Sequence, residues 1–283
     1  MPPTILVISP HLDDAVLSLG GTIARWVDEG ARVVVATVYT AGPPLEAVPP
    51  SMRPFADYET RCREDAAALE VVGAEARRLG QIERAFRPPF VTWLQAFSTP
   101  PSREGFAELR AVRTALDQLA ELSPEIVALP LGVGNHVDHV EVMVAATDWV
   151  TARGIGDRVR FYEDLYAVSG TMRRRRWVTR RRRWPPWRAP LLSAPRLAAL
   201  LVAAALARRG PAVEAYLTAP WREAAWSVEP STVRVYEDQK LAAVACYASQ
   251  VRAFGGMRSL ARVLRAYHRR WQLCEPLWRA EFS

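Results

Sequence analysis

The sequence contains little cysteine and no long uninterrupted apolar run. Its three cysteines, Cys62, Cys246 and Cys274, are odd in number and far apart, which argues against a disulfide framework and against a close pair of metal-ligating thiols. The longest purely apolar runs, such as "LAALLVAAALA" at 197–207, fall well short of the roughly 20 residues that a membrane-spanning helix needs. The start, "MPPTILVISP", lacks the basic and apolar regions of a secretory signal. These absences predict a soluble, cytoplasmic protein.

Lysine is nearly absent as well, and the positive charge is concentrated in one place. Lys240 is the only lysine, and the Arg- and Ala-rich composition is typical of a high-GC bacterial gene. Nine arginines and no acid lie in "RRRRWVTRRRRWPPWR", between Arg173 and Arg188. Because the net charge of the whole chain is only +7, the rest of the chain is slightly negative. The basicity is therefore a local feature of this Arg/Trp tract.

Buried strands alternate with helices over the first 165 residues. Short runs rich in β-branched residues predict strands at 4–9, 32–39, 76–79, 125–129 and 158–162. Apolar positions at helical spacing predict helices at 15–29, 58–72, 103–122 and 137–153. Such alternation implies parallel strands joined by right-handed crossovers. The predicted fold class is therefore α/β, with a doubly wound, mostly parallel Rossmann-like sheet.

The C-terminal part has a different pattern, without an evident linker or internal repeat. It contains the Arg/Trp tract, followed by predicted helices at 195–209, 237–252 and 257–270. We therefore expect residues 1–170 to form the α/β core, and residues 171–283 to add a basic insertion and a helical C-terminal extension to the same domain.

Three of the four histidines follow strands of the predicted sheet. His11 lies in "SPHLDD" after the first strand, whereas His136 and His139 lie in "PLGVGNHVDH" after the fourth. Ligands of doubly wound sheets bind outside the carboxyl ends of the strands, where these segments should meet. The acids that accompany the histidines are Asp13, Asp14 and Asp138.

This set of residues suits metal-assisted hydrolysis. A hydrolytic zinc site uses three nitrogen or oxygen ligands, leaves one position open for water and has a carboxylate base beside it. His11, one of the two adjacent aspartates, and either His136 or His139 would supply the ligands. The other aspartate and the other histidine would then be free to move protons. Fe²⁺ would accept the same ligands as Zn²⁺.

The ordered pair of motifs "PHLDD" and "HVDH" resembles the PIG-L, or LmbE-like, family of N-acetylglucosaminyl deacetylases. The resemblance covers about residues 4–166 and, weakly, "KLAAVACYASQ" at 240–250; "RCRE" and "YEDLYA" support it. It implies metal-dependent hydrolysis of the N-acyl amide of an amino sugar or amino-sugar conjugate, with water activated by zinc. A thiol-conjugate amidase of the same family is the alternative activity.

The resemblance also implies a role for each residue of the two motifs. His11, Asp14 and His139 would hold the metal ion, and Asp13 would be the general base. His136, if cationic, would stabilise the oxyanion and later protonate the leaving amine, and Asp138 could support that cation.

Three further positions are assigned through the resemblance. Arg61 matches a substrate-binding arginine of the family, although an ordinary exposed helix residue is an equal alternative. Glu83 stands where family members commonly carry an aspartate that holds sugar hydroxyls. Gly134 stands where some members place a tyrosine that helps to polarise the carbonyl, so this helper must be absent or come from elsewhere.

Other features have simpler interpretations. The Gly20-Gly21 pair lacks a complete dinucleotide-binding fingerprint and predicts close packing instead. His268, in "AYHRRW", has no partner among its sequence neighbours and is expected to be structural or solvated.

The Arg/Trp tract leaves several partners open. It could be a solvated insertion, or it could contact an anionic membrane surface, a phosphate-bearing substrate or an acidic carrier protein. A rival from another class is a nucleic-acid-binding protein that uses this tract. That rival does not explain the two histidine motifs, so we expect an N-acyl amino sugar or conjugate as the partner and no nucleic acid.

Overall fold

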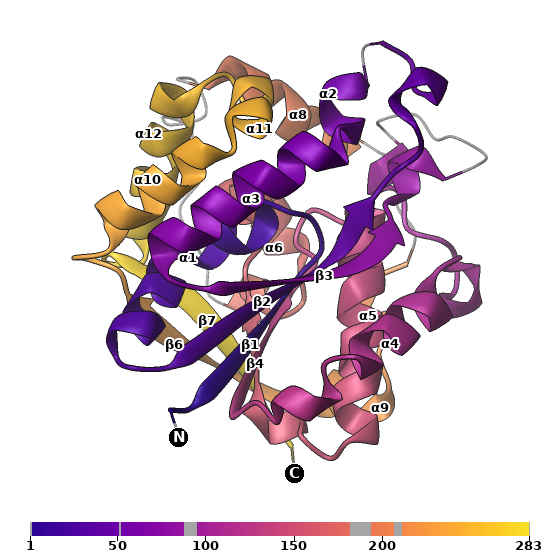
Figure 1. The fold of residues 1–283 in the computed structure, drawn as a ribbon. Helices are drawn as coiled ribbons and strands as arrows, with labels where there is room; N and C mark the ends of the chain where they lie inside the picture. Colours follow the sequence, from indigo (N-terminus) through magenta and orange to yellow (C-terminus); the bar gives the residue numbers. More distant parts are fainter. Residues whose placement is uncertain (1, 51, 88–94, 182–193, 207–210, 283) are drawn as a thin grey trace.

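The computed structural model describes residues 2–50, 52–87, 95–181, 194–206 and 211–282. Over these residues the chain forms one seven-stranded sheet flanked by helices (Figure 1). Among the described helices, none combines the length and the apolar character needed to cross a lipid bilayer.

The sheet consists of five parallel strands with an antiparallel pair added at one side. The spatial order is β3-β2-β1-β4-β5-β7-β6, with β1 paired in parallel to both β2 and β4. The predicted doubly wound, mostly parallel sheet is therefore confirmed. The strands are β1 Thr4–Ser9, β2 Arg32–Ala41, β3 Glu75–Ile82, β4 Ile126–Pro130, β5 Val159–Tyr162, β6 Ala225–Thr232 and β7 Cys274–Glu281.

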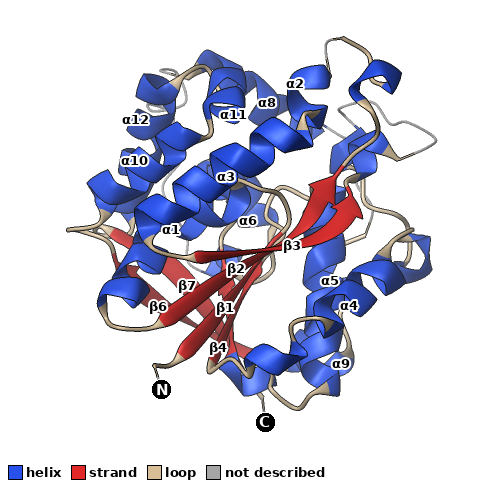
Figure 2. Cartoon of the chain, in the orientation of Figure 1, coloured by secondary structure: helices blue, strands red, loops and turns tan. Residues whose placement is uncertain are grey.

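Helices cover both faces of the sheet (Figure 2). On one face α1 packs against α3 and α10, and on the other α4 packs against α5. Leu6 and Val7 of β1 are completely buried between these layers, as expected for a central parallel strand. The described α-helices are α1 Asp14–Asp28, α2 Arg53–Ala56, α3 Tyr58–Val72, α4 Leu109–Asp117, α5 Val137–Ala152, α6 Gly170–Arg175, α8 Pro195–Leu206, α9 Ala219–Glu223, α10 Glu237–Cys246, α11 Ala248–Ala253 and α12 Met257–Arg270.

Local sequence explains the ends of α3, which holds one of the predicted site residues. The Asp57 side chain accepts a hydrogen bond from the backbone N–H of Thr60, which caps the start of the helix. Gly73 ends it with a left-handed backbone, φ 75°, that favours glycine. The observed helix has the bounds predicted at 58–72. The helix predicted at 103–122 is shorter, because only 109–117 are α-helical.

The C-terminal part is not only helical, because it also contributes two strands. β7 pairs antiparallel with β5, and β6 pairs antiparallel with β7. Pro230 of β6 lies opposite Pro276 of β7. Proline within a run argues against a strand, except at an edge or irregularity, which explains why the sequence pattern did not reveal this pair. The extension thus continues the sheet of the core.

The Arg/Trp tract begins inside the protein. Arg173 is 1% exposed and binds both carboxylate oxygens of Glu163, at 2.9–3.1 Å. Arg176 is also buried and donates to the Asn135 side chain, at 3.1 Å. The prediction of a solvated insertion is therefore wrong for these two structural arginines, whereas Arg174, Arg175 and Arg180 are exposed. Residues 182–188 lie outside the described residues, as does the end of the helix predicted at 195–209.

The lone lysine lies in a buried ionic cluster that joins the C-terminal part to α1. Lys240 is 2.6 Å from Glu275, and His268 is 2.7 Å from Glu237. His268 is fully buried, so it has partners and is not solvated. A Cβ at Gly20 would lie 2.9 Å from the Lys240 side chain. The prediction that Gly20-Gly21 serves close packing is therefore confirmed.

Candidate active site

The carboxyl ends of neighbouring parallel strands bring the predicted site residues together. His11 follows β1, whereas His136 and His139 lie at the start of α5, after β4. The chain order on the two sides of the β1–β4 pair reverses, and such a switch point opens a crevice at the carboxyl edge of a doubly wound sheet. The three imidazole rings lie there with their centroids 5.1–5.2 Å apart.

One carboxylate oxygen of Asp14 lies between two of these histidines. Asp14 Oδ2 is 3.0 Å from His11 Nδ1 and 3.1 Å from His139 Nε2. One ligand atom from each of the three residues lies within 4.8 Å of the others, and all three residues are buried. The three groups are therefore placed closely enough to share one metal ion.

Carboxylates also bind the outer nitrogen of each of these two histidines. His139 Nδ1 is 2.5 Å from Asp164 Oδ1, and His11 Nε2 is 3.1 Å from Glu83 and 3.2 Å from Asp138. Metal-bound histidines are commonly held in this way, because a carboxylate at one ring nitrogen keeps the proton there and leaves the other nitrogen free. Here the other two nitrogens, His11 Nδ1 and His139 Nε2, both face Asp14 Oδ2.

The charges of the cluster also suit a cation. Burial alone would lower the pKa values of the histidines, but the carboxylates raise that of His11 well above its usual range and that of His139 to about 9. Burial alone would raise the pKa of Asp14, yet His139 and the hydrogen bond with His11 hold it well below its usual range. His139 Nε2 is buried and makes no hydrogen bond. Since ligands must lose their protons to bind, a divalent ion would supply the positive charge that these carboxylates favour.

Asp13 and His136 lie beside this cluster and line the same pocket. Burial, and then the neighbouring Asp14 carboxylate, raise the pKa of Asp13 to about 6. Burial lowers the pKa of His136 to about 3. His136 Nδ1 is buried and makes no hydrogen bond. Both residues thus lie close to the group of His11, Asp14 and His139 without belonging to it. His136 does form a second group of this kind with His11 and Asp138, whose ligand atoms also lie within 4.8 Å of one another.

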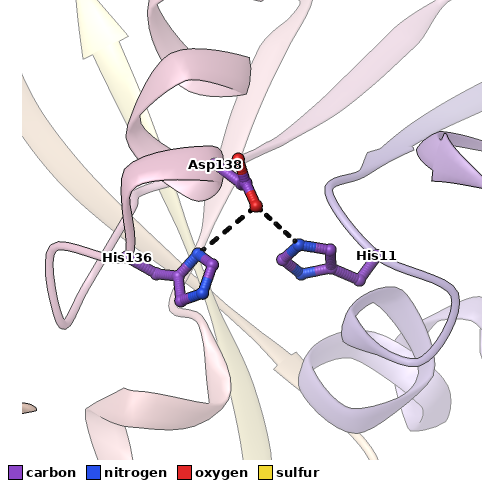
Figure 3. Close-up of side chains that lie close together, drawn as sticks. All are labelled: His11, His136 and Asp138. Carbon is purple, nitrogen blue, oxygen red and sulfur yellow. Dashed lines mark hydrogen bonds and ion pairs between the residues drawn. The ribbon is translucent and has the colours of Figure 1, made fainter. Parts of the chain in front are cut away.

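Asp138 faces two histidines at once (Figure 3). Its Oδ2 is 3.2 Å from His11 Nε2 and 3.9 Å from His136 Nδ1. The backbone N–H of Arg84 and the Arg87 guanidinium donate to the same carboxylate, at 3.1 and 3.2 Å. Asp138 is therefore held firmly, and it lies nearer to His11 than to His136.

Arg61 and Glu83 form one buried group at the wall of the pocket. Arg61 is 4% exposed, which rules out the alternative of an ordinary exposed helix residue. Its guanidinium is 3.3 Å from Glu83 Oε1, and the Tyr58 hydroxyl donates to the same oxygen at 2.5 Å. Burial alone would raise the pKa of Glu83, but the hydrogen bond with His11 and the nearby charges lower it to about 2. Both Glu83 oxygens already have protein partners.

Tyr166 fills the space beside Gly134. A Cβ at Gly134 would lie 2.8 Å from the Tyr166 side chain, and the backbone φ of 98° also favours glycine there. The Tyr166 ring is parallel to that of His136, with centroids 6.4 Å apart, and lines the pocket. Burial, and then the charges of Asp14 and Asp13, raise the pKa of Tyr166 well above its usual value. Its phenol therefore keeps its proton and can donate it in a hydrogen bond.

All eight predicted site residues converge at this edge of the sheet, but two neighbours were not predicted. Asp164 and Tyr166 both belong to "YEDLYA", directly after the strand predicted at 158–162. The rule that placed His11 and His136 after strand ends could have found Asp164 too, because β5 ends at the same edge. Its pairing with His139, however, is a contact across 25 residues of sequence.

The pocket above the cluster has a volume of about 540 Å³. Its polar lining includes His11, Asp13, Asp14, Arg61, Glu83, His136 and Tyr166. This volume falls within the range of small-molecule sites, so a ligand of moderate size could reach the cluster.

Comparison with known proteins points to one family. Residues 6–150, half of the chain, match the sequence profile of the family described as PIG-L, GlcNAc-PI de-N-acetylase. A 1D-myo-inositol 2-acetamido-2-deoxy-alpha-D-glucopyranoside deacetylase of Saccharopolyspora erythraea is 32% identical over 51% of this chain and 54% of the relative. A 2'-N-acetylparomamine deacetylase of Streptomyces fradiae is 30% identical over 56% of each chain. The chain spans about half the length of the curated relatives it matches.

The whole fold is also similar to that of a solved structure. A deacetylase in the biosynthesis pathway of teicoplanin has a TM-score of 0.69 and 25% sequence identity, with 99% of this chain and 98% of that chain covered. This similarity includes the C-terminal part, where the sequence profile does not match.

Proposed function

Because the chain belongs to the PIG-L family of de-N-acetylases, we propose that it is a metal-dependent hydrolase that removes the N-acyl group from an amino sugar or an amino-sugar conjugate. The names of two relatives, a deacetylase of an acetamido sugar linked to inositol and a 2'-N-acetylparomamine deacetylase, support this substrate class. The single observation that carries the proposal is the meeting of His11, Asp14 and His139 around one point beside Asp13.

His11 Nδ1, an Asp14 oxygen and His139 Nε2 would hold the metal ion. We take the ion to be Zn²⁺, and Fe²⁺ would fit the same donors. When bound, it would lower the pKa of a water molecule and polarise the amide carbonyl. Glu83 and Asp138 would keep the His11 ring in place, and Asp164 would do the same for His139.

Asp13 would move the proton, and His136 would stabilise the oxyanion. Asp13 takes a proton from the attacking water, whose oxygen bonds to the carbonyl carbon. Because burial lowers the pKa of His136 to about 3, the expected cationic His136 that protonates the leaving amine is not supported, and the neutral ring donates a hydrogen bond to the developing oxyanion instead. Asp13 then passes its proton to the leaving nitrogen as the C–N bond breaks. The products are a carboxylate and a free amine. Arg61 would contact the sugar side of the substrate.

The proposal is tested by loading the purified protein with Zn²⁺ or Fe²⁺ and supplying N-acetylated glucosamine derivatives. Release of a primary amine and acetate in equal amounts is the expected result. Loss of this activity with a chelator and its return with added metal would establish the metal requirement. A screen that yields amine only from sugar-linked thiol conjugates would favour the alternative amidase. If the metal-loaded protein hydrolyses neither class, the proposed function is wrong.

Asp164 is expected to govern metal affinity through His139. Asp164→Asn keeps the shape of the side chain but weakens the acceptor at His139 Nδ1, so the affinity for Zn²⁺ should fall about 10- to 100-fold. Competition with a chromophoric chelator measures this affinity without any substrate. Asp157→Asn, at an exposed aspartate in the same half of the chain, is the matched control and should not change it. Equal affinities for the two variants would reject the role of Asp164.

Tyr166 is expected to supply the hydroxyl that some family members supply from a tyrosine at the position of Gly134. If the phenol donates to the oxyanion, Tyr166→Phe should lower kcat about 10²- to 10³-fold with little change in KM or metal content. Tyr236→Phe is the control, because the Tyr236 hydroxyl binds Asp28 on the protein exterior. A Tyr166→Phe variant with unchanged kcat would show that Tyr166 only packs against His136.

A further inference from the structure

The described lining of the pocket combines the polar residues named above, here called the polar floor, with apolar side chains, here called the apolar wall. The apolar wall includes Met52, Phe55, Phe86, Leu165, Ala199 and Phe254. Among the described lining residues on the C-terminal helices, Gln250 and Arg196 are polar. The apolar residues thus outnumber the polar groups that could bind hydroxyls away from the floor.

This wall is made by two parts of the chain that meet over the site. Met52 caps the start of α2 and Phe55 lies within this helix, just before α3. Ala199 lies on α8, Ala253 ends α11 and Phe254 follows it. The last three lie beyond residue 150, where the match to the family profile ends. Most of the polar residues of the pocket therefore lie within the part that matches the family profile, whereas one wall comes from the part beyond it.

The apolar side chains of the wall favour the binding of apolar groups over hydroxyl groups. Hydroxyl groups pressed against methionine and phenylalanine would lose their hydrogen bonds to water without replacement, which is costly. An apolar group placed there removes apolar surface from water on both sides, which is favourable. A pocket of about 540 Å³ also falls in the range that takes drug-sized ligands.

We propose that the substrate is an N-acyl amino sugar with an apolar alkyl or aryl aglycone, and that this aglycone binds against Met52, Phe55, Ala199 and Phe254. The inference rests on the proposed function and narrows its substrate class. The amide of the substrate lies at the polar floor, and the aglycone extends along the apolar wall. A sugar linked to a polar group, such as a polyol, leaves that wall without a partner.

The test compares the methyl and hexyl β-glycosides of N-acetylglucosamine with the metal-loaded protein. The expected kcat/KM for the hexyl glycoside is at least about tenfold higher, because five further CH₂ groups become buried. The methyl glycoside of N-hexanoylglucosamine, which carries the apolar chain on the acyl side instead, should not share this advantage.

A substitution that fills the wall tests the location. Ala199→Phe should lower the ratio of the kcat/KM values for the hexyl and methyl glycosides to near one, since the phenyl group would occupy the space of the hexyl chain. Val202→Phe is the matched control, because Val202 lies on the same helix, is 57% exposed and does not line the pocket. It should leave both rates unchanged.

The remaining outcomes separate this inference from the proposed function. Equal hydrolysis of the two glycosides, or a preference for the N-hexanoyl compound, would overturn the apolar aglycone while the hydrolase remains. An advantage of the hexyl glycoside that survives Ala199→Phe would overturn its proposed location. Hydrolysis of none of the three compounds would overturn the proposed function and this inference with it.

Discussion

Asp13→Asn is expected to bind Zn²⁺ as tightly as the unaltered protein and to lose about 10³- to 10⁴-fold in kcat. Asn has nearly the same size as Asp but cannot accept a proton, and general base catalysis contributes at this scale. Asp13 lines the pocket beside the metal-type cluster, but the ligand atoms that converge there come from His11, Asp14 and His139. The change therefore removes a proton acceptor and leaves the ligands in place.

Metal content and turnover must be measured on the same preparation of Asp13→Asn. Element analysis after dialysis gives the metal content, and amine release from an N-acetylated glucosamine gives kcat. A variant with full metal content and nearly full activity would show that another group takes the proton. A variant that has lost its metal would place Asp13 among the ligands.

The second large effect is expected for His139→Ala, which should lose its metal ion. The change removes one of three ligands, so the affinity should fall by more than the roughly 10- to 100-fold that a lost carboxylate partner costs. It also leaves Asp164 and Asp14 buried without the imidazole between them. Because Asp164 loses its ion-pair partner and Asp14 keeps His11 alone, a lower thermal stability of the metal-free variant is expected as well.

His136→Gln provides the contrast for His139→Ala, because both residues lie in one segment of the chain. His136 lines the pocket but lies outside the group of His11, Asp14 and His139, so its variant should keep the metal and lose activity. Chelator competition distinguishes the two variants without an assay of turnover. If both lose the metal equally, or if His139→Ala keeps it, the proposed ligand set is wrong.

The catalytic motifs could be predicted because their information is local. A buried strand such as β1 must end in a turn, and the residues of that turn stand next to it in the sequence. Alternation of strands and helices then places His11 and His139 at the same edge of the sheet. The predicted convergence of these residues agrees with the observed geometry, in which both rings face Asp14. Their catalytic roles remain predictions.

Partners that lie far apart in the sequence were not predicted. Glu83 was expected to hold sugar hydroxyls, but in the structure its carboxylate binds His11, Arg61 and Tyr58. His268 was expected to be structural or solvated, and it is structural: it is buried beside Glu237, which is 31 residues away in the sequence. In each case the sequence reveals a charged or polar residue without indicating which opposite charge it meets.

The sequence by itself determined the alternation of strands and helices in the α/β core, the donor types of the site and their placement after strands. Only the tertiary structure decided that Asp164 binds His139, that β6 and β7 continue the sheet, and that α8 and α11 close an apolar wall over the pocket. The physical reason is the distance in sequence between interacting residues. Turns, caps and periodic apolar positions depend on residues a few places apart. Side-chain pairs and pocket walls depend on packing between segments that meet only after the chain has folded.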